Sequence, residues 1–71
     1  MMTRAAKESA AQTSYVERKR VFVDACVAFA EAVLTHEDLS HADVIAARDA
    51  CHRAKLLKES AWRTLQEVMF K

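Results

Sequence analysis

Two cysteines and three histidines give this sequence its widest range of chemistry. Cys26 and Cys51 could pair as a disulfide or, with a histidine, bind zinc, which takes about four ligands from thiolate and imidazole groups. His52 follows Cys51 directly and so points to another side of a helix, while His36 and His41 lie in a polar stretch away from either cysteine. We therefore expect no metal site and interpret both cysteines as buried free thiols, with a disulfide as the alternative.

His36, Glu37, Asp38 and His41 form a cluster of groups that can act as acids or bases. Such groups catalyse reactions when they line a concave, water-poor pocket that holds a substrate. A turn between helices is convex, and polar residues of these types are typical of turns and helix caps. The sequence also has no glycine-rich loop for phosphate and no nucleophile–base–orienter set. We expect a non-enzymatic protein without a cofactor.

The chain has 71 residues and contains neither glycine nor proline, the two residue types that end helices most reliably. The polar stretch from Thr35 to His41 is therefore the one obvious interruption of helical sequence. This pattern predicts an all-α fold, an antiparallel two-helix hairpin, with a helix at 14–36, a turn at 36–40 and a helix at 41–70. Residues 1–13 are expected to form an alanine-rich arm or an extension of the first helix.

Two local patterns set the predicted helix starts. Ser14 and Glu17 have the spacing of a capping box, in which each side chain accepts a hydrogen bond from the backbone amide of the other. Ser40 is the predicted N-cap of the second helix, where Asp43 suits the positive end of the helix dipole.

The second helix carries a heptad row in which spacings of three and four residues alternate. The row consists of Val44, Ala47, Cys51, Ala54, Lys58, Ala61, Leu65 and Val68. The facing residues expected on the first helix are Tyr15, Phe22, Cys26, Phe29 and Val33. A fold near residue 38 sets phenylalanines opposite alanines and Cys26 level with Cys51, and large side chains beside small ones fill space well. Lys19 comes level with Lys58, and the two either point outward or form a polar layer.

Apolar residues cover too much of the first helix for one partner. Their arc spans roughly 240°, whereas a single packing surface needs ~100°. The second helix also overhangs the helix predicted at 14–36 with large apolar residues, and we favour a second chain over the N-terminal arm as their cover. We therefore predict a homodimer that forms a four-helix bundle. The predicted dimer interface consists of Val16, Val23, Val27, Leu34, Trp62, Leu65 and Met69.

Apolar residues also interrupt the polar face of the second helix. An apolar row flanked by charged side chains fits the groove of another protein, although a self-association surface produces the same pattern. The partner-binding residues that we predict are Ile45, Arg48, His52, Leu56, Arg63 and Phe70.

The charge balance limits the classes of partner. The chain has 11 lysines and arginines against 10 aspartates and glutamates, so no strong overall field attracts nucleic acid or an anionic membrane. The most apolar run, residues 21–34, contains two acidic residues and is shorter than the roughly 20 residues that span a bilayer. The first residues also lack the apolar core of a signal peptide. We expect a cytoplasmic protein that does not enter membranes.

In size and predicted architecture the chain is similar to the plasmid copy-number regulators of the Rop type, which are short hairpins that dimerise into bundles. It also resembles the hairpin chaperones of type III secretion and the small helical proteins with which phages inhibit host proteins. The function that we predict is a protein–protein interaction module, an adaptor or inhibitor of a larger host protein, encoded by a phage or plasmid. A dimeric Rop-like RNA- or DNA-binding regulator and a secretion-type chaperone are the alternatives.

Overall fold

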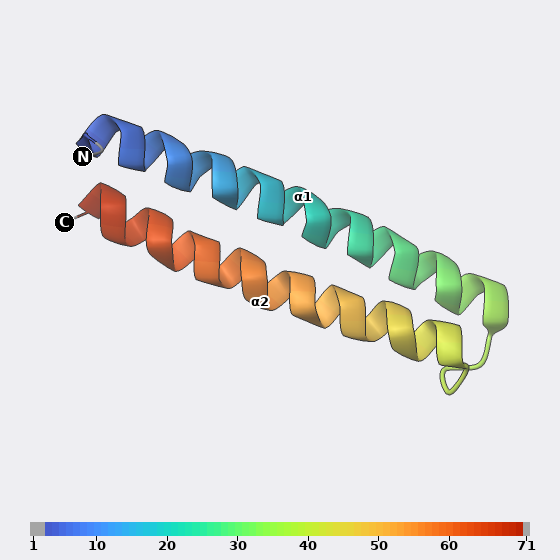
Figure 1. The fold of residues 1–71 in the computed structure, drawn as a ribbon. Coiled ribbons are helices and arrows are strands. Elements are labelled where there is room, and N and C mark those ends of the chain that lie inside the picture. Colours follow the sequence, from blue (N-terminus) through green and yellow to red (C-terminus); the bar gives the residue numbers. More distant parts are fainter. Residues whose placement is uncertain (1–2, 71) are drawn as a thin grey trace.

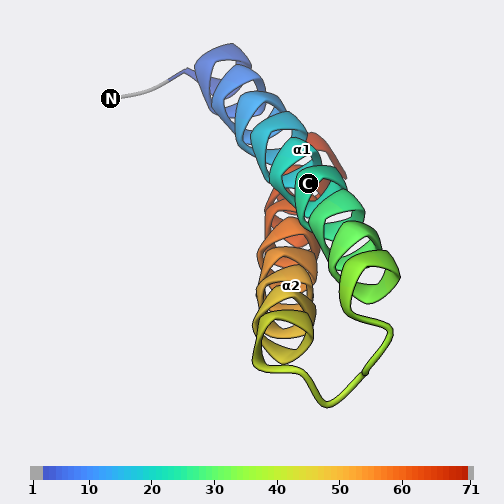
Figure 2. The same ribbon diagram turned by 90° about the vertical axis from the view of Figure 1, so that its right-hand side faces the viewer.

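The computed structural model describes residues 3–70, which form two helices and one turn. Helix α1 spans Arg4–His36 and helix α2 spans Ala42–Phe70. The two helices run antiparallel and side by side over their whole length (Figure 1), and the molecule measures 50 × 18 × 14 Å. Seen from the turn end, the two ribbons overlap, and the turn that connects them lies below (Figure 2). The predicted all-α hairpin is confirmed.

Helix α1 begins at Arg4, well before the capping box predicted at Ser14. Thr3 is the N-cap, and its hydroxyl oxygen accepts a hydrogen bond of 3.1 Å from the amide of Ala6. Ser14 and Glu17 lie inside the helix. The alanine-rich segment has high helix propensity and a cap of its own, so it extends the helix instead of forming a separate arm.

This extension makes the two helices similar in length, with 33 residues in α1 and 29 in α2. Ala11 is only 6% exposed and comes level with Leu65, which is 7% exposed. The C-terminal end of α2 is therefore covered by the start of α1. Our expectation that a second chain covers this end was wrong for Leu65, because it took the helix start from the capping box alone.

The turn occupies residues 37–41 and is held by local hydrogen bonds. Glu37 has left-handed backbone angles (φ 56°, ψ −2°), and its amide donates to the carbonyl of Val33 at 3.0 Å. The Asp38 carboxylate accepts hydrogen bonds from the Ser40 hydroxyl at 2.7 Å and from the Ser40 amide at 2.9 Å. These two bonds favour the charged carboxylate, and they hold the pKa of Asp38 below its usual range.

His41, not Ser40, caps helix α2. The His41 carbonyl accepts the first intrahelical hydrogen bond, from the Ile45 amide at 3.0 Å. The His41 Nδ1 accepts a second bond from the Asp43 amide at 3.1 Å. The predicted cap was wrong by one residue because the Ser40 hydroxyl already donates to Asp38 within the turn.

The seam between the helices follows the predicted heptad row. Every predicted residue of that row in α2 is buried or half-buried, and Val44 and Ala54 are only 2% and 5% exposed. The rings of Tyr15 and Trp62 lie 5.2 Å apart, which agrees with a chain that folds back near residue 38. Because the seam contains many small residues, the hairpin has a thin core.

Candidate functional site

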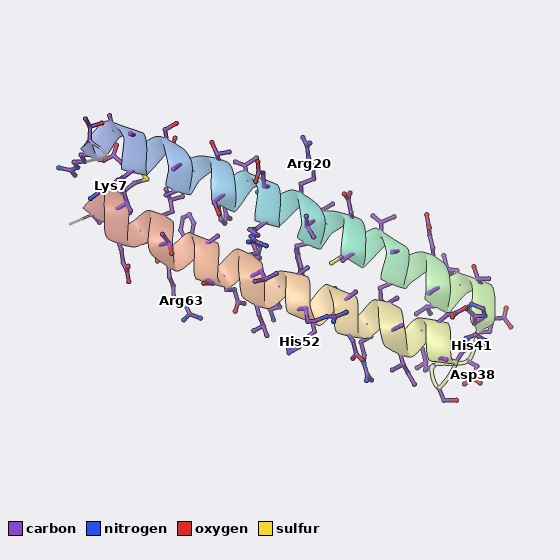
Figure 3. All side chains as sticks on the ribbon, in the orientation of Figure 1. Lys7, Arg20, Asp38, His41, His52 and Arg63 are labelled. Atoms are coloured by element: carbon purple, nitrogen blue, oxygen red, sulfur yellow. The ribbon has the colours of Figure 1, made fainter. Side chains whose placement is uncertain are left out.

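A second heptad row lies on the surface of α1. Its spacings alternate between four and three residues, as those of a coiled-coil seam do. We call it the α1 outer row; it consists of Val16, Arg20, Val23, Val27, Ala30 and Leu34. The four large apolar side chains are 58%, 49%, 53% and 78% exposed in chain order. Arg20 points away from α2 (Figure 3), so α2 leaves the row uncovered.

The other residues of the predicted dimer interface belong partly to the hairpin itself. Leu65 is buried against α1 in the seam, so it does not form part of an exposed surface. Trp62 packs against Tyr15 and stays 44% exposed, and Met69 is 38% exposed. The carbonyl oxygen of Met69 lies 3.5 Å from the Arg4 guanidinium, which joins the start of α1 to the end of α2.

The predicted partner-binding residues all lie exposed on α2. Ile45, Leu56 and Phe70 are 37%, 50% and 77% exposed. His52 and Arg63 point away from α1 (Figure 3). We call this set, with Arg48, the α2 outer row. Its apolar members are separated by charged and polar side chains, so it forms no continuous apolar patch.

The two cysteines face each other across the seam. Their Sγ atoms lie 3.4 Å apart, and both side chains are half-buried free thiols. The hydrogen bond with Cys51, followed by desolvation, raises the pKa of Cys26. The prediction that Cys26 and Cys51 lie level with each other on the two helices is confirmed.

Lys58 lies over an aromatic ring of the neighbouring helix instead of pointing outward. Its ammonium nitrogen lies 4.6 Å from the centre of the Phe22 ring, whereas Lys19 is exposed. A cation over an aromatic face is attracted by the ring quadrupole. Within residues 3–70, Lys58 forms no ion pair and remains in the seam row.

Three side chains meet at the turn. The imidazole rings of His36 and His41 stack with centroids 3.8 Å apart and an interplanar angle of 13°. The Asp43 Oδ2 atom lies 3.3 Å from His36 Nε2 and 4.0 Å from His41 Nδ1. We call these three residues the turn cluster. The sequence prediction grouped His36 and His41 with Glu37 and Asp38 and missed Asp43, which was assigned only to the helix dipole. The position of Asp43 two residues after His41 was the usable signal.

Comparison of the chain with protein-family models, curated proteins and solved structures gave no match. Neither helix that the structure describes has the length and apolarity needed to cross a bilayer.

Proposed function

We propose that this chain is a non-enzymatic protein–protein interaction module, an adaptor or inhibitor, that works as a homodimer. The α1 outer row is the observation that supports this proposal best. Exposed apolar residues are ordinary when scattered, but a heptad row of them along one helix is the pattern of a packing surface. In this dimer the α2 outer row stays available to a larger protein.

The α1 outer row is complementary to a reversed copy of itself. When two α1 helices lie antiparallel about a two-fold axis near Val23 and Val27, these two valines face each other across the axis. Val16 then lies level with Leu34 of the partner subunit. Arg20 lies level with Ala30 of the partner subunit, so that the one long polar side chain meets the smallest one. A two-fold interface requires this kind of self-complementary surface.

Charge agrees with the same register. Glu31 follows Ala30 in sequence, and the helix geometry places Glu31 and Arg20 on the same side of the row. In the antiparallel pair, Arg20 therefore comes beside Glu31 of the partner subunit, and symmetry repeats the contact. Neither side chain forms an ion pair within the part of the chain that the structure describes.

The energy of the row predicts a dimer of moderate strength. Burying the exposed part of one such side chain contributes about 1 kcal/mol, or about 8 kcal/mol for the eight in two copies. Association costs roughly 4–15 kcal/mol in lost freedom. The rows alone thus support a concentration-dependent dimer, and Trp62, which contacts Tyr15 beside Val16, adds surface to it.

The dimer is tested by solution mass over a range of concentrations, with two matched valine variants. Val23→Asp places a charge in the row and should give a monomer. Val21→Asp is the control, because Val21 is 54% exposed, against 49% for Val23, but lies outside the row. Equal effects of the two variants, or a monomeric parent chain, would contradict the dimer.

Charge reversal tests the register without depending on apolar packing. Arg20→Glu should weaken the dimer, and adding Glu31→Arg should restore it, because the pair is only reversed. If Glu31→Arg does not restore the dimer mass, the antiparallel register is wrong. The valine variants then still show whether the row forms a dimer in another register.

The role of the α2 outer row is tested with Leu56→Glu, which should abolish capture of a protein partner and leave helix content unchanged. Loss of helix content would instead place Leu56 in the core. If the parent chain binds RNA or DNA with an affinity that falls steeply with salt, the regulator alternative holds in place of the adaptor.

A further inference from the structure

The turn cluster brings three metal-ligand side chains together from two helices. His36 is the last residue of α1, His41 caps α2, and Asp43 lies in the first turn of α2. One ligand atom from each lies within 4.8 Å of the others. The left-handed Glu37 and the hydrogen-bonded Asp38 hold the turn that sets this arrangement.

The distances are close to those of a metal site. Zinc binds imidazole nitrogen and carboxylate oxygen at about 2.0–2.2 Å, so neighbouring ligand atoms of a tetrahedral site lie ~3.4 Å apart. His36 Nε2 and Asp43 Oδ2 are already 3.3 Å apart. His41 Nδ1 lies 4.0 Å from the same oxygen. The two stacked rings must turn out of parallel for both to bind one ion, because a metal lies in the plane of each imidazole. The Asp43 side chain is 71% exposed, so it is free to rotate.

The hydrogen bond of His41 also suits a metal ligand. Its Nδ1 accepts from the Asp43 amide, so the lone pair of this nitrogen is directed toward the first turn of α2. A metal ion would take that lone pair, and the amide would then bond to water at the exposed turn. The opposite dipole ends of α1 and α2 meet here and largely cancel. The Asp43 carboxylate supplies negative charge to the cluster, and the Asp38 carboxylate is close enough to interact with His41 as well.

We propose that His36, His41 and Asp43 form a three-ligand site for a divalent transition-metal ion of the zinc type. Two imidazoles and one carboxylate favour zinc, cobalt, nickel or copper over calcium and magnesium, which take oxygen ligands. The remaining position is open to water. The bound ion ties the end of α1 to the start of α2, and this site does not depend on the dimer proposed above.

The experiment titrates the full chain with zinc chloride by calorimetry and with cobalt(II) by visible absorption. His41→Asn removes the imidazole but keeps a favoured helix N-cap, and His36→Gln removes the other. His52→Gln is the matched histidine control, since His52 lies far along α2 from His41 (Figure 3). Cys26→Ser tests the thiol pair as a competing site.

We expect one zinc ion per chain and an affinity at least about tenfold lower in both turn variants. His52→Gln and Cys26→Ser should bind as the parent does, and the cobalt absorption bands should disappear only in the turn variants. Zinc should also raise the melting temperature of the parent but not of His41→Asn. The proposal is overturned if the parent shows no saturable binding, if all variants bind alike, or if Cys26→Ser loses the ion while His41→Asn keeps it.

Discussion

Among residues 3–70, Glu37 is the one residue with a positive φ. A left-handed conformation costs a residue with a Cβ roughly 1–2 kcal/mol, and glycine is the usual occupant of this position after a helix. The sequence places glutamate there, so the turn stores a small strain.

We expect Glu37→Gly to stabilise the hairpin by about 0.5–1 kcal/mol, since relief of the strain exceeds the entropy that glycine adds to the unfolded chain. The free energy of unfolding from urea titration measures this effect. Glu37→Ala is the control and should bring no gain, because alanine keeps the Cβ. A loss of stability in Glu37→Gly would show that the glutamate side chain has a role of its own.

The facing thiols of Cys26 and Cys51 give a second prediction at the residue scale. Addition of diamide should join them in an intrachain disulfide, with two electrons and two protons passing to the diamide and the chain losing the mass of two hydrogen atoms. Because the 3.4 Å separation already brings the sulfur atoms into contact, little movement is needed. The cross-link should stabilise the hairpin by about 3 kcal/mol.

The pH dependence of this oxidation follows from the raised pKa of Cys26. The thiolate is the attacking species, and a raised pKa leaves less thiolate at neutral pH than in an ordinary cysteine. The oxidation rate should therefore rise with pH. The midpoint of this rise should lie at a higher pH than for a free cysteine peptide. Mass spectrometry without reductant follows the reaction, and mixed disulfides between chains in place of the intrachain product would contradict the geometry.

At the scale of the elements, the first turns of α1 contribute to the seam. Ala11 is buried although it lies in the segment that the sequence left as arm or extension. The start of α1 is thus part of the hairpin, joined to α2 by packing near Leu65 and by the contact from Arg4 to the Met69 carbonyl.

Ala11→Asp should destabilise the hairpin by about 2–4 kcal/mol, because it puts an unpaired charge into the seam. Ala28→Asp is the control, since Ala28 is exposed on the same helix, and it should change stability by less than about 1 kcal/mol. Thermal unfolding followed by circular dichroism compares the two. Equal stability of the two variants would show that the start of α1 frays from α2 in solution.

At the scale of the whole molecule, the hairpin is a thin rod with little interior. Four residues, Ala11, Val44, Ala54 and Leu65, are the buried apolar residues of the described chain. Small cores of this kind usually gain stability from another chain or from a ligand. Folding and association of this protein should therefore be coupled.

We expect the melting temperature of the parent chain to rise with protein concentration, because a dimer that forms only from folded chains stabilises them by mass action. Val23→Asp should melt at one temperature at every concentration. Differential scanning calorimetry at several concentrations measures both. A concentration-independent melting temperature in the parent would mean that the α1 outer row stays uncovered in solution.

The sequence by itself determined the hairpin and its seam. Without glycine or proline, only residues 35–41 could interrupt the helices, and the heptad row from Val44 to Val68 identified the buried face of α2. Such periodic patterns are local, so they can be read without knowing the partner. The same patterns gave the apolar residues of the α1 outer row.

Only the tertiary structure decided which residue caps α2, what covers Leu65 and which side chains meet at the turn. The burial of Leu65 depends on packing against the start of α1, which a capping pattern at Ser14 does not contain. His36 and His41 stack across a turn that contains the left-handed Glu37, a backbone state that this residue type does not favour. The candidate metal site was therefore absent from the sequence prediction, since it arises where the end of α1 and the start of α2 meet at this turn.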